Sequence, residues 1–600
     1  MKNSLFATTE APSPKHRTEH DRVLLRDAHT ERWLDFSQPQ TVVSTCKIEE
    51  VVACLHEVEL LVATHGWAAA GFLTYEAAPA FDTSLRVQED NSFPLLWFGL
   101  YLPPHPVDVP EPEPTTLLPD LSWTATVSDT EYAASIRRLQ DYIAAGDTYQ
   151  VNYTYRLRTP FRGATWPLFT RLVADHQPEF GGFLQTREWA MLSLSPELFF
   201  QLHGERIESI PMKGTIGRAL TAADDLKQGL RLQNSAKDQA ENVMIVDMVR
   251  NDLARIALPG SVQVENLFAV QRYPTLWQMV SPVLARTRAS LCEIFAALFP
   301  AASITGAPKA RTMAIISELE TSPRRIYTGT IGFLLPDGRA QFNVAIRTLL
   351  IDRQKGVAEY GVGGGITADS TAAAELEETR LKSLICRSRQ PDFCLLETLL
   401  WTPDEGYALL PEHFRRLTAS ADYYSYPCDL ANIQAQLDTA VTGYGGIRRK
   451  VRMLLDRRGR LRIEAMPFDP PDTKHPVRVM LAPHPIDEQN VFLYHKTTHR
   501  EHYDRIRAGL PQGVDDVLFY NRQGEVTETT IANIVVTIKN RQYTPPVRCG
   551  LLAGTCRQHL LDTGRLEERV LTLDCLQTLT GFTLINAVRG CYPGILASPL

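Results

Sequence analysis

The chain lacks the cysteine patterns that mark zinc sites or disulfide scaffolds. Its ten cysteines are spread over 600 residues and form no C-x-x-C pair and no zinc-ligand spacing. A chain of this length can bury a core without disulfide bonds. We therefore expect reduced thiols, a cytoplasmic location and chemistry that does not depend on cysteine.

Long apolar segments and an excess of positive charge are also missing. No stretch reaches the roughly 20 apolar residues that span a bilayer. Residues 1–20 contain no apolar core of a signal peptide, so we interpret them as a polar arm. The net charge of −7 gives no electrostatic reason to expect nucleic acid or an anionic membrane as a partner. Small molecules and proteins remain as the partners to expect.

The pattern along the chain indicates two domains of mixed secondary structure. The chain is too long for a single core. Helical patterns such as residues 131–146 alternate with β-rich ones such as residues 149–161, which predicts an α/β or α+β fold. A polar, proline-containing junction follows near residue 386. We predict a layered sheet-and-helix domain over residues 21–388 and a smaller α/β domain over residues 392–600.

Three consecutive glycines, residues 363–365, follow a strand-like segment and precede a predicted helix. This order predicts a turn whose backbone N–H groups cradle a carboxylate or phosphate, although an ordinary flexible turn fits three glycines equally. In the helix, Glu375, Glu378 and Lys382 have spacings of three and four and share one face. Taken alone, that face fits a solvated ion pair.

A second predicted helix, residues 240–257, favours a metal over a solvated pair. Its run VMIV requires burial, yet Glu241, Asp247, Arg250 and Asp252 bring charge to the same segment. Charges close to a core need partners or a metal. Two helices that each present a carboxylate to one cavity can hold Mg2+, which leaves open positions for substrate oxygens.

These stretches, together with four shorter motifs, resemble the chorismate-utilising enzymes, the family of anthranilate, isochorismate and aminodeoxychorismate synthases. The similarity covers nearly all of residues 125–385. The motifs are SPELFF at 195–200, PMKGTIGR at 211–218, SITGAPK at 303–309 and VAIRTL at 344–349.

The resemblance implies a role for each matching residue. It makes Glu241 and Glu378 direct Mg2+ ligands and Glu375 a ligand acting through water. It makes Glu197 the general acid that protonates the departing C4 hydroxyl of chorismate. The groups that it places around the substrate carboxylates and ring are Thr305, Tyr327, Arg347, Gly364, Gly365 and Lys382.

The residues at two positions distinguish between the reactions of this family. Isochorismate and salicylate synthases need a lysine to deprotonate water, whereas this chain has Gln150, which cannot act as a base. Anthranilate synthases share the glutamine but have a small residue in place of Lys213. If burial lowers its pKa, Lys213 can attack C2 while Glu197 protonates the leaving group. Ammonia then attacks C4, which is the aminodeoxychorismate synthase reaction.

Two departures from the family pattern stand out. Family members commonly have a histidine near the ring where this chain has Gln278, although an amide can still hydrogen-bond a hydroxyl or carboxylate. The Leu-Leu-Glu-Ser signature of tryptophan sensing is missing, and VLLRDA at 23–28 is the nearest string. We therefore expect no tryptophan feedback.

The second half offers what pyridoxal phosphate requires: a lysine, an acid beside the pyridine nitrogen, and phosphate donors. Lys496 follows the apolar string VFLY, which predicts a strand end. Glu528 lies in an alternating segment ahead of a strand. Gly554 and Thr555 precede a helix whose first amides can bind phosphate. Each feature alone also fits a surface lysine, an exposed strand glutamate or a simple helix cap.

Together these segments resemble the class IV aminotransferase fold over about residues 392–595. The resemblance implies pyridoxal 5'-phosphate bound covalently to Lys496, with Glu528 keeping the pyridine nitrogen protonated and Arg416 with Thr555 binding phosphate. Because such folds often dimerise, we expect a homodimer through this domain.

The fold alone does not separate a lyase from a transaminase. The fusion favours a lyase, because the product of the first domain carries the amine that the second would capture. Lys496 would then remove the C4 proton, and loss of pyruvate would give 4-aminobenzoate, a folate precursor. The alternatives are an anthranilate synthase joined to a transaminase, and a chain with one half kept as a scaffold. No glutaminase segment is evident, so we expect a separate glutamine amidotransferase to supply ammonia.

Overall fold

The computed structural model describes residues 22–112, 121–383, 391–442, 446–469, 475–577, 579 and 581–597. The predicted polar arm and most of the predicted junction near residue 386 lie outside these ranges. The chain divides into two compact units. Unit 1 comprises residues up to Thr215, Leu232–Tyr273 and Gln278–Arg389, and unit 2 comprises Ile216–Arg231, Pro274–Trp277 and Gln390–Leu600.

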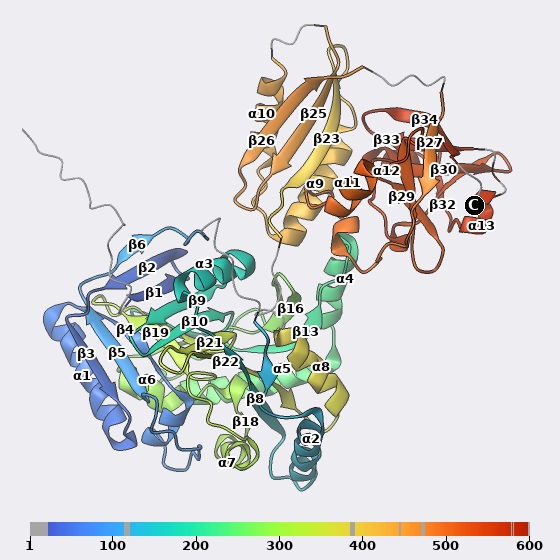
Figure 1. Ribbon diagram of the computed structural model, residues 1–600. Helices are drawn as coiled ribbons and strands as arrows, with labels where there is room; N and C mark the ends of the chain where they lie inside the picture. The colour runs from blue at the N-terminus through green and yellow to red at the C-terminus, as the bar shows by residue number, and fades with distance from the viewer. Residues whose placement is uncertain are drawn as a thin grey trace, which may run out of the picture. The chain divides into compact units, whose positions relative to one another are not determined.

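Unit 1 is built on two large sheets of antiparallel strand pairs (Figure 1). The first has the order β18-β8-β22-β21-β10-β9-β1-β2-β6, and β7 pairs with β8. Its strands are β1 (Arg22–Asp27), β2 (Arg32–Ser37), β6 (His105–Val107), β7 (Thr124–Ala125), β8 (Gln150–Pro160), β9 (Phe180–Gln185), β10 (Trp189–Ser195), β18 (Gly306–Ala307), β21 (Thr348–Asp352) and β22 (Val357–Ile366).

The second sheet has the order β14-β17-β12-β11-β20-β19-β4-β5-β3, and a separate small sheet has the order β13-β16-β15. The strands of the second sheet are β3 (Thr41–Thr45), β4 (Ala68–Leu73), β5 (Leu96–Tyr101), β11 (Leu198–His203), β12 (Arg206–Ile210), β14 (Gln263–Val264), β17 (Val283–Arg286), β19 (Thr330–Leu334) and β20 (Ala340–Val344). The small sheet consists of β13 (Met212–Gly217), β15 (Ala269–Arg272) and β16 (Leu276–Val280).

The core of unit 1 lies in layers on both faces of each sheet. In β1, Val23 and Leu25 contact the core shared with the second sheet, whereas Leu24 contacts the helices on the other face. This follows from the two-residue period of a strand and explains why β1 is apolar at successive positions. Buried residues on both faces give a four-layer arrangement of helices, sheet, sheet and helices.

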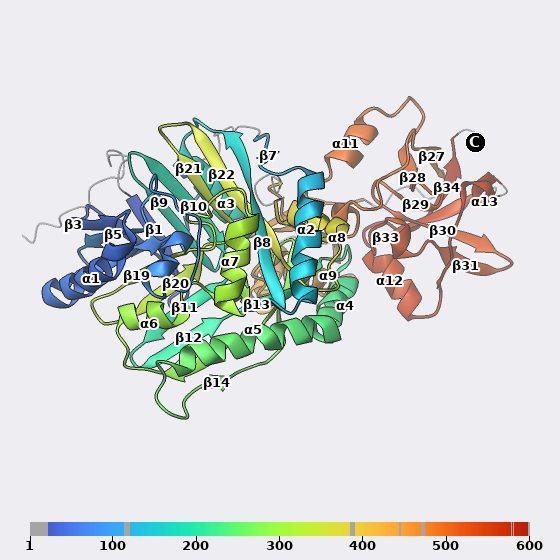
Figure 2. The same ribbon diagram turned by 90° about the horizontal axis from the view of Figure 1, so that it is seen from below.

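The helices of unit 1 cover the outer faces of the two sheets. α1, α5 and α6 pack on the second sheet, and α2, α3 and α7 pack on the first, as Figure 2 shows. Ser128 and Glu131 form a capping box at the start of α2, which satisfies two backbone N–H groups. The helices are α1 (Val51–His65), α2 (Asp129–Ala144), α3 (Thr165–His176), α5 (Ala236–Ala254), α6 (Leu291–Leu298), α7 (Lys309–Leu319) and α8 (Ala372–Ser383).

Unit 2 contains a four-stranded sheet and a larger sheet. The four-stranded sheet has the order β24-β23-β25-β26, with α9 packed on β23 and α10 on β26. Its elements are β23 (Leu395–Thr402), β24 (Gly406–Tyr407), β25 (Arg449–Leu455), β26 (Leu461–Pro467), α9 (Leu410–Tyr424) and α10 (Leu430–Ala440).

The larger sheet of unit 2 has the order β29-β28-β27-β34-β33-β30-β31-β32. β29 also pairs with β30, which closes the strands between them into a ring. Its strands are β27 (Val477–Leu481), β28 (Asp516–Tyr520), β29 (Val526–Thr529), β30 (Asn533–Ile538), β31 (Arg541–Thr544), β32 (Glu567–Glu568), β33 (Phe582–Asn586) and β34 (Gly590–Leu596). The helices beside it are α11 (Glu501–Ala508), α12 (Thr555–Asp562) and α13 (Leu573–Gln577).

A segment from the first half of the chain also forms part of unit 2. It runs from Ile216 into α4 (Ala222–Gln233). Arg218 makes a buried ion pair with Asp225 at 2.7 Å and donates to the backbone oxygen of Tyr423 at 2.9 Å. The hydroxyl of Tyr423 donates in return to the carbonyl of Ala219 at 2.8 Å. These contacts hold the segment against α9.

The predicted mixed α/β (α+β) class is confirmed, but two local predictions are wrong. Residues 363–365 do not form a turn: they belong to β22 and pair with residues 152–154 of β8. The string VFLY is no strand, because Val491–Leu493 is a 3-10 helix. Glycine counts as a turn signal only where the chain must bend, and here it serves close approach of side chains to a strand.

Candidate active sites

Lys213 lies in β13 with its amine against β22. A Cβ on Gly365 would lie 2.2 Å from Nζ of Lys213 and 2.0 Å from Nε2 of Gln150. Only glycine leaves room for both side chains. Burial lowers the pKa of the Lys213 amine, and the charge of Glu241 opposes part of that shift. The predicted nucleophile and Gln150 therefore meet at one glycine.

Gln150 itself is almost fully buried, and its side-chain oxygen has no hydrogen-bond partner among the residues that the structure describes. A buried acceptor without a partner carries a free-energy cost unless a ligand or water donates to it. Since its amide nitrogen lies beside Lys213, this oxygen offers an acceptor to a nitrogen-containing ligand.

Glu241 of α5 and Glu375 and Glu378 of α8 lie near the Lys213 amine. Each carboxylate contributes to the pKa of Lys213, and Oε2 of Glu375 lies 2.9 Å from where a Cβ on Gly364 would be. Burial raises the pKa of Glu241 and of Glu375, and the like charge of Glu378 adds to both shifts. The two helices thus gather negative charge beside β22.

Lys382 offsets part of this charge. Its amine lies 2.7 Å from Oε1 of Glu378 and donates to the carbonyl of Gly363 at 2.9 Å. The ion pair with Lys382 holds the pKa of Glu378 below its usual range. This is the i,i+4 pair that the sequence predicted, but it faces β22 as well as solvent.

The carboxylates have the chemistry that Mg2+ prefers. In the described part of the chain, however, no three histidine, cysteine or carboxylate side chains are gathered closely enough to hold a metal ion. Glu378 is instead paired with Lys382. By their chemistry the three carboxylates suit the ion.

Glu197 is a second buried acid, located between β10 and β11. Its carboxyl Oε1 accepts a hydrogen bond from Ser303 at 2.5 Å. Burial raises the pKa of Glu197 to about 7, although Ser303, the Met212 backbone, Lys213 and Arg347 each lower it. A carboxyl with this pKa is partly protonated at neutral pH and can donate a proton.

Arg347 lies between β20 and β21 in a left-handed backbone conformation, with a φ of 49°. This residue separates β20, which ends at Val344, from β21, which begins at Thr348. The guanidinium donates to Oε1 of Gln278 at 3.3 Å and lies 5.5 Å from the ring centroid of Tyr273. No carboxylate neutralises Arg347 in these contacts, so it is available to an anionic ligand. Gln278, the departure from the family pattern, is its partner.

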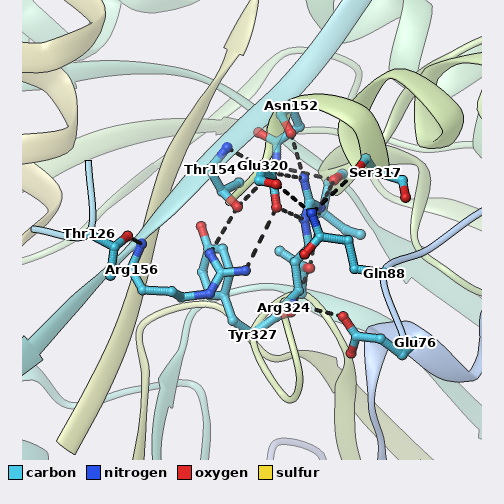
Figure 3. A network of polar contacts seen from close by, with 12 residues as sticks. Glu76, Gln88, Thr126, Asn152, Thr154, Arg156, Ser317, Glu320, Arg324 and Tyr327 are labelled. Atoms are coloured by element: carbon cyan, nitrogen blue, oxygen red, sulfur yellow. Dashed lines mark hydrogen bonds and ion pairs between the residues drawn. The ribbon is translucent and has the colours of Figure 1, made fainter. Parts of the chain in front are cut away.

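Tyr327 and Thr305 lie beside a buried network, shown in Figure 3. The ring of Tyr327 packs on Gly361, where a Cβ would lie 2.1 Å from the ring. Burial raises the pKa of Tyr327 to about 12. Thr305 is fully buried, and its backbone oxygen accepts from the amide of Asn152 at 2.8 Å.

The network centres on Glu320 and Arg324, whose side chains are 3% and 1% exposed and 2.7 Å apart. Arg324 also donates to the carbonyls of Ile304 at 2.9 Å and Asn152 at 2.7 Å (Figure 3). It therefore joins β8, which carries Gln150, to the turn that carries Ser303 and Thr305. The sequence analysis did not identify this network.

Unit 2 contains a cavity of about 590 Å³ that is lined by all four predicted cofactor residues, Lys496, Glu528, Arg416 and Thr555. Burial lowers the pKa of Lys496 to about 8, and the nearby positive charge of Arg416 adds to the effect. An amine with this pKa has a much larger neutral fraction near physiological pH than an ordinary lysine, which favours Schiff-base formation.

Glu528 is held by three donors at the cavity wall. Its Oε1 accepts from the Tyr503 hydroxyl and from the Leu552 amide, each at 3.2 Å, and its Oε2 accepts from Asn533 at 3.2 Å. Burial raises the pKa of Glu528 to about 7. The side chain is 7% exposed, so it is no exposed strand glutamate, and it can bond a protonated ring nitrogen.

Arg416 is fixed by Glu397, which the sequence analysis missed. Its Nε and Nη2 donate to the two carboxylate oxygens of Glu397 at 2.8 and 2.6 Å, a bidentate pair. Nδ1 of His413 lies 2.6 Å from the same carboxylate, and its Nε2 lies 3.4 Å from the hydroxyl of Thr555. Arg416 and the surrounding donors hold the pKa of Glu397 down at about 2.

Thr555 begins α12, and Gly554 is its N-cap, as predicted. Arg416 and Thr555 are therefore joined through Glu397 and His413 at the wall of one cavity, where exposed helix amides and a cation suit a phosphate. The chemistry of this donor set fits pyridoxal phosphate. Glu397 lies in the apolar string LLETLL, and its charge there was the available signal, whereas His413 lies in the polar string PEHFRR, which gave none.

Two known families match the chain. Residues 103–385 match the chorismate binding enzyme family, and residues 394–595 match amino-transferase class IV. The chain thus contains a chorismate binding enzyme domain followed by a class IV amino-transferase domain, as the motifs predicted. Both parts are enzyme domains.

Individual relatives resemble the first part. Aminodeoxychorismate synthase component 1 of Klebsiella aerogenes is 44% identical over 260 residues, which are 43% of this chain and 57% of that protein. Anthranilate synthase component 1 of Streptomyces coelicolor is 37% identical over 265 residues, 44% of this chain and 51% of that protein. The chain thus spans little more than half the length of these relatives.

Among solved structures, anthranilate synthase component I from Streptococcus pneumoniae TIGR4 aligns with a TM-score of 0.52 and 22% identity. The alignment covers 63% of this chain and 94% of that one, and it shows the fold. Within the described ranges, none of the helices is both long and apolar enough to cross a membrane.

Proposed function

We propose that this chain makes 4-aminobenzoate in two steps. Unit 1 converts chorismate and ammonia to 4-amino-4-deoxychorismate, and unit 2 eliminates pyruvate from that product. The observation that carries the proposal is the buried amine of Lys213, which lies against Gly365 beside Gln150. A small residue at this position would instead admit ammonia to C2, the anthranilate reaction.

In unit 1, the neutral amine of Lys213 attacks C2 of chorismate. As the C2–N bond forms, the two ring double bonds shift to C1=C6 and C4=C5 and the C4–O bond breaks, and Glu197 gives its proton to the departing hydroxyl, which leaves as water. Ammonia then bonds to C4 as the C2–N bond breaks, and Lys213 is released. The para position of the new amine follows from this double displacement.

The substrate carboxylates need positive charge and hydrogen-bond donors. Arg347 would bind one of them, and Thr305, Tyr327, Lys382 and the amides of residues 364–365 would orient the ring. Mg2+, held by Glu241, Glu378 and, through water, Glu375, would supply the charge that neutralises a substrate carboxylate.

In unit 2, Lys496 removes the C4 proton of the bound intermediate. Glu528 would hold the ring nitrogen of pyridoxal phosphate, and Arg416 with Thr555 would hold its phosphate; the cofactor would supply an electron sink. The C3–O bond then breaks, the enolpyruvyl group departs and takes up a proton to become pyruvate, and the ring becomes aromatic.

The chain needs a source of ammonia, and we propose a separate glutamine amidotransferase subunit as the donor. We further propose a cytoplasmic, folate-supplying enzyme that forms a homodimer through the class IV domain. If the purified chain alone makes product from glutamine, the separate donor is refuted.

The test is an incubation of the full chain with chorismate, ammonium and Mg2+, with and without pyridoxal phosphate, followed by mass identification of products. We expect 4-amino-4-deoxychorismate without the cofactor and 4-aminobenzoate plus pyruvate with it. An ortho-amine would establish the anthranilate alternative. If only one half is active and the other fails to bind its metal or cofactor, the inactive half is a scaffold.

A further inference from the structure

Three cationic side chains from three separate elements line the cavity of unit 2 away from the residues assigned above. Lys450 belongs to β25, Arg507 to α11, and Arg589 to the turn between β33 and β34. They are close enough that Arg589 and Arg507, together with Arg452, lower the pKa of Lys450, which burial also lowers.

These three cations differ from the other arginines of the cavity wall. Arg416 is paired with Glu397, Arg500 with Asp504 at 3.1 Å, and Arg452 with Glu464 at 3.1 Å. In contrast, Lys450, Arg507 and Arg589 have no carboxylate partner among the described residues.

The aromatic neighbour of Arg589 does not supply negative charge. Its guanidinium lies 5.8 Å from the ring centroid of Tyr592, and burial raises the pKa of that phenol to about 12, so it is neutral. Keeping like charges together in a partly closed cavity costs free energy unless an anion joins them.

Lys450 lies further along the four-stranded sheet than the point where the sheet meets Lys496. In the four-stranded sheet, Leu396 donates to the carbonyl of Lys496 at 2.8 Å, whereas Lys450 pairs with Leu400, four residues further along β23. At the rise of a strand, this separation is roughly 13 Å. Lys450 and Arg452 are two residues apart, so they face the same side of the sheet and point with Thr398 into the cavity.

We infer that Lys450, Arg507 and Arg589 form a carboxylate-binding rim that selects substrates with two carboxylates over amino acids with one. This inference rests on the proposed function, since it names the substrate class of the same site. The elimination substrate carries one carboxylate on its ring and another on its enolpyruvyl group.

A second carboxylate gives the substrate two charge-assisted contacts where an ordinary amino acid makes one. Three converging cations also leave an unpaired positive charge when a monoanion binds, which penalises the wrong substrate. The rim therefore favours a dianionic substrate, which the proposed elimination requires, over an amino acid with one carboxylate.

The test compares two aromatic probes that differ by one carboxylate: 5-aminoisophthalate and 3-aminobenzoate. Binding to the full chain loaded with pyridoxal phosphate is followed through the cofactor's absorbance, without Mg2+, so that only the unit 2 site reports. We expect tighter binding of the dianion. Lys450→Met and Arg589→Met should weaken it roughly 10- to 100-fold and change 3-aminobenzoate binding by no more than about twofold.

Arg507→Met provides a third variant, because Arg507 is exposed and its loss leaves the fold intact. Arg541→Met is the matched control: Arg541 is 69% exposed, lies on β31 of the same unit and does not line the cavity, so probe preference should stay unchanged. The proposed rim is refuted if the native chain binds both probes equally well. It is also refuted if all three variants keep the full preference for 5-aminoisophthalate. A retained preference without any 4-aminobenzoate formation would refute the proposed function and leave the rim standing.

Discussion

The hydroxyl of Ser303 donates a 2.5 Å hydrogen bond to Oε1 of Glu197, and this bond favours the ionised form of a carboxyl whose pKa burial raises to about 7. Because Glu197 must be protonated to donate, synthase activity should fall as the pH rises through about 7. Removing the hydroxyl removes a contact that lowers the pKa. In Ser303→Ala, the fall in synthase activity with rising pH (the falling limb of the pH profile) should therefore occur at higher pH.

The measurement is the pH dependence of kcat/KM for ammonium-dependent turnover of chorismate. Glu197→Gln keeps the shape of the side chain but has no carboxyl proton, so its residual activity should lack the limb. If the fall in activity occurs at the same pH in Ser303→Ala and is still present in Glu197→Gln, it reports the titration of another group.

Lys213→Ala should reduce formation of 4-amino-4-deoxychorismate by roughly 100-fold or more, because the nucleophile that redirects ammonia to C4 is lost. The space that it leaves should let some ammonia reach C2, and a small amount of ortho-amine should appear. Product masses and isomers decide the result. Normal para-amination by the variant would exclude the covalent route.

Glu378→Gln should weaken Mg2+ binding on the order of tenfold or more, because a charged oxygen ligand is lost. Calorimetric titration of the full chain with Mg2+ measures the affinity directly. Glu377→Gln is the matched control, since Glu377 is the neighbouring residue of α8 and its side chain is 62% exposed. If the two variants bind Mg2+ with equal affinity, Glu378 is not a metal ligand.

Glu320→Gln should destabilise unit 1 by about 3–5 kcal/mol, because it leaves the buried guanidiniums of Arg324 and Arg156 without their carboxylate. Both arginine side chains are only 1% exposed. Glu318→Gln, near the end of α7, removes an exposed surface pair with Arg138 of α2 and should cost no more than about 1 kcal/mol. Denaturant unfolding of the full chain, followed with probes for each unit, compares the two.

Arg416→Gln should weaken pyridoxal phosphate binding and destabilise unit 2 by about 3 kcal/mol, since it strands the buried carboxylate of Glu397. The pKa of Glu397 is depressed to about 2, below the usual 4.5. Its contribution to stability is therefore present above about pH 4.5 and is lost as the pH falls toward 2. In the variant this acid-sensitive contribution should shrink.

Cofactor titration and unfolding between pH 2 and 7 test this expectation. Arg415→Gln serves as the control, because the neighbouring Arg415 is 62% exposed and pairs with Asp562 at the surface. Unchanged cofactor affinity in Arg416→Gln would place the phosphate elsewhere.

Motif residues could be predicted from the sequence because their chemistry is unusual for their setting. A carboxylate in an apolar helix, as at Glu241, or a lysine in the PMKGT string, as at Lys213, is costly unless it has a function. The periodicity of apolar residues likewise indicated the mixed fold and helices such as α2 and α8. These are local properties, which neighbouring residues in the chain reveal.

Partners across the fold could not be predicted in this way. Ser303 contacts Glu197 from 106 positions away, and His413 reaches Thr555 across 142. The glycines at 363–365 looked like a turn because the sequence does not show that side chains from β8 and β13 approach that strand.

The sequence by itself determined the two families, the two sets of reactive side chains and the mixed helix-and-strand class, because these depend on residue type and short spacing. Only the tertiary structure decided which residues hold those side chains and shift their pKa values. It also decided that Lys450, Arg507 and Arg589 converge on one cavity. Burial and long-range contacts arise when distant segments pack together, and no local pattern encodes them.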